Sequence, residues 1–309
     1  MTTPSIYAEF AAREARGVSP AYDRLATAVA ADPEILELLG TVPPAKRQPN
    51  LLFAVVRRLG GPVDDPAAFH EYAVTHWSAI RNGLLTRATQ TNEIGRCALL
   101  LPILAALPQP LALLEAGASA GLNLYPDRYG YDYDGHRIGA DEPVLTCALT
   151  GTPAPRRLPE IVWRAGLDRN PLTITDPDDR AWLEALIWPE HHERRDRLRQ
   201  AAAVAGQPPL TRGDLVDDLP ALAAQAPRDA TLVVFHTSVL YQVPPPRRER
   251  FAALVRDLPG HWISVEAPGV IPLGQLPPPP DGTLHNVVAL DGIAKGWARP
   301  HGQALTWFA

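Results

Sequence analysis

The stretch LALLEAGASAGLN at residues 111–123 decides the fold. An apolar run ends in a carboxylate and then turns through small residues, a pattern typical of a parallel-sheet strand that leads into a nucleotide-binding loop. Gly117 and Gly121 allow backbone angles that a Cβ forbids, and the small residues between them let a ligand approach the main chain. Counted from Gly117, the dinucleotide fingerprint Gly-x-Gly-x-x-Gly would need glycines in place of Ser119 and Leu122, so the stretch departs from that fingerprint.

The chain changes character around this stretch. Up to about residue 108, apolar residues recur at helical spacing with no strand-like run between them. After that point short β-prone runs alternate with helical stretches, which predicts βαβ units and a parallel sheet. We expect parallel strands at Leu111–Glu115, Ile161–Leu167, Leu210–Arg212, Thr231–His236 and His261–Glu266. Two further runs, joined by a Gly-containing link, predict an antiparallel hairpin made of Asn286–Leu290 and Ala304–Phe308.

These patterns predict two regions. Residues 1–108 form an all-helical N-terminal region on the substrate side, and residues 109–309 form a Rossmann-like domain. The segment at about 122–159 is too long for one crossover helix and is expected to be an insertion. Within it, the run from Tyr129 to Gly135 predicts an inserted hairpin or loop.

The motif Glu-x-Gly-x-Ser-x-Gly, from Glu115 to Gly121, resembles the first motif of S-adenosylmethionine (SAM) methyltransferases, with one glycine changed to Ser119. Five parallel strands followed by an antiparallel hairpin also resemble the strand inventory of that fold. The resemblance predicts an α/β fold: a SAM-methyltransferase-like, Rossmann-type mixed sheet of seven strands with a terminal antiparallel hairpin, preceded by the helical region.

What this resemblance implies for the cofactor can be carried onto the residues at the strand ends. SAM would bind at Gly117, Ser119 and Gly121, with its amino acid, ribose and adenine portions held by Glu115, Asp168 and Asp214. Arg96 would meet the methionine carboxylate. Each residue also has a structural interpretation: Glu115 as a buried carboxylate satisfied by loop amides, Asp168 and Asp214 as turn residues, and Arg96 as the partner of Glu115 or Asp127.

The methyl acceptor would meet the cofactor where the fourth strand ends, at His236. A histidine poised near neutral pH could remove the acceptor's proton, and the alternative is a histidine hydrogen-bonded under the loop. Asn92, Tyr125 and Trp188 are expected to shape the pocket for a small-molecule substrate.

Three other functions compete with methyl transfer. The first is a ligand-binding protein that keeps the fold without catalysis, and the second is an NAD-dependent oxidoreductase. The third is an α/β-hydrolase, because Gly117 to Gly121 also has the Gly-x-Ser-x-Gly spacing of a nucleophile elbow, with Asp214 and either His236 or His285 to complete a triad. Against it, only helices precede this strand, and Pro126 interrupts any long helix after it.

The composition of the chain limits the classes of partner that the sequence predicts. The formal net charge of −5 argues against nucleic acid, which needs a clustered basic surface. Cys97 and Cys147 are too few for a disulfide framework or a cysteine metal site, and His191 and His192 are adjacent and point apart on a helix, so no metal is expected. The sequence has no apolar run of membrane-spanning length and no signal-peptide pattern, which predicts a cytoplasmic protein without a membrane partner. It does not specify the oligomeric state.

Several of these motifs together resemble a bacterial family labelled domain of unknown function 2332, and the resemblance spans nearly the whole chain. The label implies no activity. The motifs are Gln90–Arg96, Leu114–Leu124, Asp127–Tyr129, Trp182–Pro189, Arg212–Asp214 and Phe235–Thr237.

Overall fold

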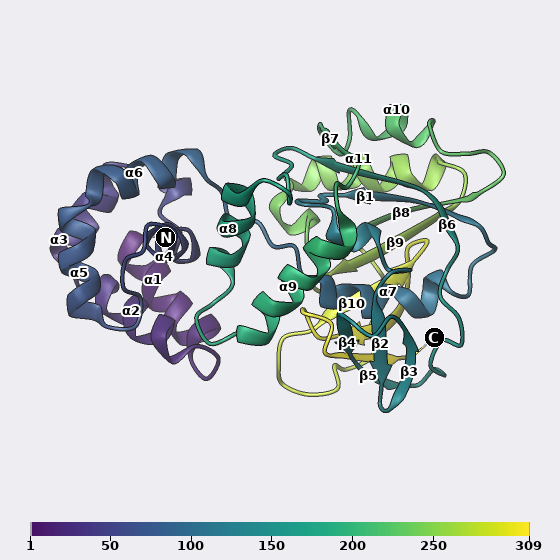
Figure 1. Cartoon of the computed structure of the whole chain (residues 1–309), viewed down its shortest axis with the longest axis horizontal. Coiled ribbons are helices and arrows are strands. Elements are labelled where there is room, and N and C mark those ends of the chain that lie inside the picture. The colour runs from purple at the N-terminus through teal and green to yellow at the C-terminus, as the bar shows by residue number, and fades with distance from the viewer. Residues whose placement is uncertain (1, 309) are drawn as a thin grey trace. The chain divides into compact units, whose positions relative to one another are not determined.

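The computed structural model describes residues 2–308, which form two compact units (Figure 1). The helical unit comprises the chain up to Thr91 together with Asp176–Asp196, and the sheet unit comprises Asn92–Thr175 and the chain from Arg197 onward. The first boundary therefore falls at Asn92 rather than at residue 108. The apolar helix α7 (Cys97–Leu104) belongs to the sheet unit, and the segment after residue 175 returns to the helical unit.

The helical unit begins most of its helices with the same device. A side chain of Thr2, Ser19, Asp32, Asp65 or Asp176 accepts a hydrogen bond from the first turn, and a proline stands at one of the first two helical positions. The helices are α1 (Thr3–Phe10), α2 (Pro20–Ala30), α3 (Pro33–Gly40), α4 (Pro49–Arg58), α5 (Pro66–Thr75), α6 (Trp77–Thr86), α8 (Pro177–Leu186) and the start of α9 (His192–Ala205), with a π-helix at Ala11–Ala15 and a 3-10 turn at Pro44–Lys46.

The core of this unit is aromatic. The Phe53 ring of α4 lies against the rings of Tyr7, Phe10, Tyr22 and Phe69, with centroids 4.8 to 6.3 Å apart. Tilted and edge-to-face contacts of this kind add to the burial of apolar surface. The sequence patterns that predicted helices here therefore reflect one packed core.

The sheet unit is built on a nine-stranded, mostly parallel sheet with the order β5-β12-β11-β10-β9-β8-β1-β6-β7. The parallel strands predicted from the sequence are all present, and β1 lies inside the sheet, paired in parallel with both β6 and β8. Their bounds are β1 (Leu111–Ala116), β6 (Ile161–Asp168), β7 (Leu210–Arg212), β8 (Thr231–Thr237) and β9 (His261–Glu266). The mixed α/β prediction is confirmed at this level.

The C-terminal part of the sheet differs from the prediction. β10 (Asn286–Leu290) pairs antiparallel with β9, and β12 (Ala304–Trp307) is two strands further out, because β11 (Ile293–Ala298) lies between them. The expected direct pairing of residues 286–290 with 304–308 is wrong, and the terminal hairpin is instead a three-stranded antiparallel meander. The expected total of seven strands is also too low, since β11 and the parallel edge strand β5 (Ala148–Thr150) add to it.

The insertion after β1 holds a second, small sheet in place of a crossover helix. A 3-10 turn at Leu122–Leu124 is followed by β2 (Gly130–Tyr133) and β3 (His136–Gly139), which form the inserted hairpin, and by β4 (Val144–Thr146), parallel to β2. The hydroxyls of Tyr129 and Tyr133 donate to the carbonyls of Leu122 and Ala98, which ties the insertion to the loop and to α7.

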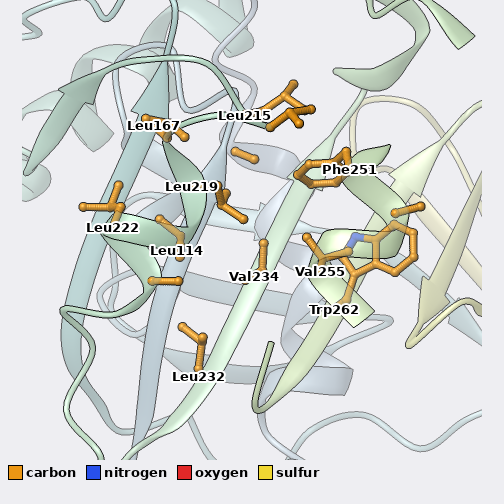
Figure 2. Close-up of a cluster of buried hydrophobic side chains, with 14 of the residues drawn as sticks. Leu114, Leu167, Leu215, Leu219, Leu222, Leu232, Val234, Phe251, Val255 and Trp262 are labelled. Carbon is orange, nitrogen blue, oxygen red and sulfur yellow. The ribbon is translucent and has the colours of Figure 1, made fainter. Parts of the chain in front are cut away.

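The helices α10 (Leu219–Ala223) and α11 (Pro245–Asp257) cover one face of the main sheet (Figure 2). Leu114, Val234 and Trp262 stand side by side on β1, β8 and β9 and point towards Leu219 of α10 and Phe251 of α11 (Figure 2). Because side chains alternate along a strand, the residues between them point to the opposite face.

No helix within residues 2–308 is long and apolar enough to cross a membrane.

Candidate functional site

Four polar residues lie at the carboxyl ends of neighbouring parallel strands: Asp168 ends β6, Glu115 is the penultimate residue of β1, Thr237 ends β8 and Glu266 ends β9. The chain runs from β1 outward to β6 and β7 and then returns to β8 on the other side of β1. The strand order therefore switches direction between β1 and β8. In open α/β sheets, ligands bind beyond the carboxyl ends of the strands at such a switch point.

The backbone conformation of the loop after β1 requires glycine at two positions. Gly117 has φ +77°, and a Cβ there would lie 2.5 Å from Val239 Cγ2. Gly121 has φ +73°, and a Cβ there would lie 2.7 Å from Pro208 Cβ. Ser119 has φ +52°, a left-handed conformation that an L-residue adopts at a cost of about 1–2 kcal/mol. Strained residues of this kind cluster at functional sites.

Asp168 organises this loop. Its Oδ2 accepts a hydrogen bond from Ser119 N at 2.8 Å, and its Oδ1 accepts one from Asn170 N at 2.7 Å. Gly117 N donates to Leu167 O at 2.7 Å, so the loop is held against the end of β6. Asp168 thus has the turn-forming role, while each carboxylate oxygen has a second lone pair that can accept a ligand's hydroxyl.

Glu115 is 2% exposed and only half satisfied. Its Oε1 accepts a hydrogen bond from Asn123 Nδ2 at 3.1 Å, and its Oε2 is buried with no hydrogen-bond partner among residues 2–308. Burial raises the pKa of this carboxyl to about 8, with a further rise from Asp168, and the opposing effects of Asn123 and Arg96 are smaller. Glu115 is therefore mostly protonated at neutral pH.

The segment before α7 joins the loop. Asn92 Oδ1 accepts a hydrogen bond from Leu122 N at 3.1 Å. Arg96 is 5% exposed and donates to Thr237 O at 2.9 Å and to Pro300 O at 3.0 Å. The predicted residues Asn92 and Arg96 therefore lie together with the loop after β1, and Arg96 also links it to the end of β8.

Asp214 lies close to Asp168, but one of its carboxylate oxygens already has partners within the protein. Gly213 N donates to Asp168 O at 2.9 Å, which places the two acidic residues on adjoining turns. Asp214 Oδ1 accepts from Val216 N at 2.8 Å and forms an ion pair with Arg247. Burial raises the pKa of Asp214, but hydrogen bonds from Val216 N and Arg247 outweigh it, so that the pKa is lowered. All of these contacts are made to Oδ1.

The other two residues expected to shape the pocket have different surroundings. Tyr125 follows the 3-10 turn and has the guanidinium groups of Arg128 and Arg164 over its ring, at 5.1 and 5.0 Å from the centroid. Trp188 belongs to the helical unit, where its Nε1 donates to Asn50 Oδ1 at 2.9 Å.

His236 lies on the opposite face of the sheet from Glu115, among the apolar residues under α11. It is fully buried; its Nδ1 is 2.8 Å from Glu266 Oε1, and its Nε2 accepts a hydrogen bond from Trp262 Nε1 at 3.1 Å. An indole N–H is only a donor, so Nε2 carries the lone pair and Nδ1 the proton. Both ring nitrogens are thus engaged. The catalytic role of His236 stays a prediction, and this geometry leaves it no nitrogen for a substrate.

Sequence reasoning missed Glu266. Its Oε1 accepts hydrogen bonds from Val239 N at 2.8 Å and Leu240 N at 2.9 Å in addition to the one from His236. It ends the fifth parallel strand as Glu115 ends the first, so the rule that drew attention to Glu115 also applied to it. Ser238, in the loop after β8, is left-handed with φ +54° and carried no such signal.

In the hydrolase alternative Ser119 would be the nucleophile, but no histidine in the described part of the chain is hydrogen-bonded to it as a general base. Ser119 Oγ is buried and has no hydrogen-bond partner among residues 2–308, whereas a nucleophilic serine needs a histidine within reach. A 3-10 turn, not a long helix, follows the loop. Across the same residues, no three His, Cys, Asp or Glu side chains gather as a metal site.

The fold and this edge define the class: a mixed α/β protein with a mostly parallel sheet and a buried polar cluster at its switch point. The chain belongs to the DUF2332 family, described as uncharacterized protein conserved in bacteria, whose model matches residues 5–307. A comparison with curated proteins finds no match.

Proposed function

We propose that the sheet unit binds SAM at its carboxyl edge and transfers the methyl group to a small molecule. The observation that carries the proposal is the hydrogen bond from Ser119 N to Asp168 Oδ2, because it joins the loop after β1 to the acidic end of β6 beside the switch in strand order. The five parallel strands followed by antiparallel ones support it, since this inventory resembles that of the SAM methyltransferases.

Two buried oxygens at the loop fit a ligand with hydrogen-bond donors. Glu115 Oε2 and Ser119 Oγ have no hydrogen-bond partner within residues 2–308. A buried polar atom without a partner costs about 1–3 kcal/mol. A ligand that supplies an ammonium and hydroxyl groups here would remove both costs.

In the proposed complex, Glu115 holds the amino group of the ligand, Arg96 its carboxylate and Asp168 its ribose hydroxyls. Asp214 meets the adenine amino group beside Arg247. An ammonium next to Glu115 would stabilise the ionised carboxylate and lower a pKa that burial has raised. The loop residues Gly117, Ser119 and Gly121 allow the ligand to approach the main chain.

Bound SAM supplies an electrophilic methyl group to a nucleophilic acceptor. The chain's own contribution is to hold the two groups in line and to exclude water, which is most of what methyl transfer requires. Glu115 and Ser119 are 2% and 4% exposed, so these two side chains are shielded from solvent. The proposal assigns no proton transfer to His236, because its nitrogens are engaged by Glu266 and Trp262.

Ligand binding without catalysis is the second candidate. Two observations favour it: the 3-10 turn at Leu122–Leu124 offers no helix N-terminus to the ligand, and Arg247 occupies one oxygen of Asp214. Under this alternative the chain senses an adenosyl compound with the same residues.

Calorimetric titration of the full chain with SAM and with S-adenosylhomocysteine tests the proposal. We expect saturable binding that Asp168→Ala abolishes and that Asp229→Asn leaves unchanged, since Asp229 is exposed in the turn before β8, at the other edge of the sheet. Saturable binding of NADH in place of SAM would move the assignment to an oxidoreductase.

Incubation with methyl-labelled SAM and small-metabolite pools then separates the two candidates. Label transferred to a small molecule supports methyl transfer. Tight SAM binding with no labelled product across broad pools supports the binding-only alternative.

A further inference from the structure

A second polar cluster lies on the α11 face of the sheet, at the ends of β8 and β9. Glu266 Oε1 accepts three hydrogen bonds, from His236 Nδ1, Val239 N and Leu240 N, at 2.8 to 2.9 Å. Glu266 Oε2 is also buried but has no hydrogen-bond partner among residues 2–308. The whole side chain is 3% exposed.

The hydrogen bonds at Oε1 favour the ionised carboxylate. Burial raises the pKa of Glu266, but the hydrogen bond and the electrostatic attraction from His236, together with the hydrogen bonds from the two amides, outweigh burial and lower the pKa, so the group is ionised. Trp262 Nε1 donates to His236 Nε2, so the proton that His236 shares with Glu266 is on Nδ1. An anionic oxygen, Oε2, therefore lies inside the protein without a donor among residues 2–308.

The cluster is continuous with the proposed site. Val239 N donates to Glu266 Oε1, and the side chain of Val239 lies where a Cβ of Gly117 would be, so one residue connects Glu266 to the loop after β1. Glu266 also ends a parallel strand at the carboxyl edge, where ligands of such sheets bind.

We propose that Glu266 Oε2 binds a cationic N–H group, an ammonium or guanidinium, of the small-molecule substrate. This rests on the proposed function in that it deepens its substrate class, but it does not depend on the identity of the cofactor. A buried anionic oxygen without a donor is costly, and a charge-assisted hydrogen bond from a cation is the strongest way to satisfy it.

The test compares charged and neutral probes on the full chain and on Glu266→Gln. The glutamine keeps one oxygen for the three donors that hold Oε1 and replaces Oε2 with an NH₂ donor, so it changes the proposed contact with little change to the fold. Glu160→Gln is the control, because Glu160 is exposed. The probes are ethylammonium and methylguanidinium, with ethanol as the neutral counterpart, and binding is measured by NMR titration.

We expect the cationic probes to bind the wild type and Glu160→Gln alike, and Glu266→Gln to bind them about ten- to a hundredfold more weakly. Equal binding to the wild type and Glu266→Gln would overturn the inference. If Glu266→Gln does not fold, the wild type decides: cationic probes that bind no better than ethanol contradict the proposal.

Titration of the same samples with SAM distinguishes a failure of the cationic site from a failure of the proposed function. Loss of probe binding in Glu266→Gln with SAM binding retained supports the assignment of Glu266. A wild type that binds the cationic probes but not SAM refutes the proposed cofactor while supporting the cationic site.

Discussion

Glu115 and Glu266 stand at the same edge of one sheet, each buried at the end of a parallel strand, and yet they differ in charge. Glu115 receives one hydrogen bond, from Asn123, and burial raises its pKa to about 8. Glu266 receives three hydrogen bonds, and its pKa is lowered although burial opposes this. Hydrogen-bond donors and neighbouring charges therefore decide the charge of each buried carboxylate: Asp168 raises the pKa of Glu115 further, whereas His236 lowers that of Glu266.

The largest expected effect comes from removing the carboxylate that has more donors. Glu266→Leu leaves three buried N–H groups without an acceptor, and we expect it to lower the free energy of unfolding by about 3–5 kcal/mol. Glu115→Leu removes a mostly neutral group with one donor and is expected to cost about 1–2 kcal/mol. Urea unfolding of both variants measures the difference. Equal losses would contradict the expected difference between the two carboxylates.

An intermediate effect is expected in the pH dependence of Glu115→Gln. Because the folded-state pKa of Glu115 is raised from 4.5 to about 8, the native state holds an extra proton between these values, and the wild type loses stability as the pH rises through that window. Glutamine has no such proton. The stability of the variant relative to the wild type should therefore increase with pH, by at most about 1.4 kcal/mol per pH unit.

Glu266→Gln should show the opposite trend. Its wild-type pKa is lowered, so the ionised carboxylate contributes stability above its unfolded-state pKa of 4.5 and loses it as the pH falls. The variant is expected to be most destabilised at neutral pH and least in acid. Thermal unfolding of both variants from about pH 4 to about pH 9 checks the two trends. Parallel pH profiles would contradict the contrast between the carboxylates.

The smallest expected effect concerns the left-handed serine in each loop. Ser119→Gly relieves backbone strain and removes a buried hydroxyl without a hydrogen-bond partner among residues 2–308, so it should stabilise the protein by about 1 kcal/mol. Ser238→Gly relieves similar strain but loses the hydrogen bond from Asn286 Nδ2 at 3.1 Å, so we expect little net change. The denaturant midpoints of the two variants, each measured against the wild type, test this difference in stability. A destabilised Ser119→Gly would mean that Ser119 has a structural role in the loop.

Much of the fold could be predicted from residues close together in sequence. The apolar runs at Leu111–Glu115 and Thr231–His236 identify interior parallel strands, because strand propensity and burial are local properties. Ser-Pro and Asp-Pro pairs, such as Asp32-Pro33, likewise mark helix starts locally. The meander was not predictable in the same way: β11 (Ile293–Ala298) contains Lys295 and Gly296, and only its pairing with β10 and β12 makes it a strand.

The candidate site likewise combines features that the local sequence determines with features that only tertiary contacts determine. The sequence by itself determined that Glu115, Gly117, Ser119 and Gly121 form a turn at a strand end, since that turn depends on four neighbouring residues and their allowed backbone angles. Only the tertiary structure decided what each polar group does. His236 and Glu266 are 30 residues apart in the chain and Asp214 and Arg247 are 33 apart, so their charge and free lone pairs follow from donors that folding brings in. Hydrogen bonds to a buried group act over about 3 Å of space, whatever the distance along the chain.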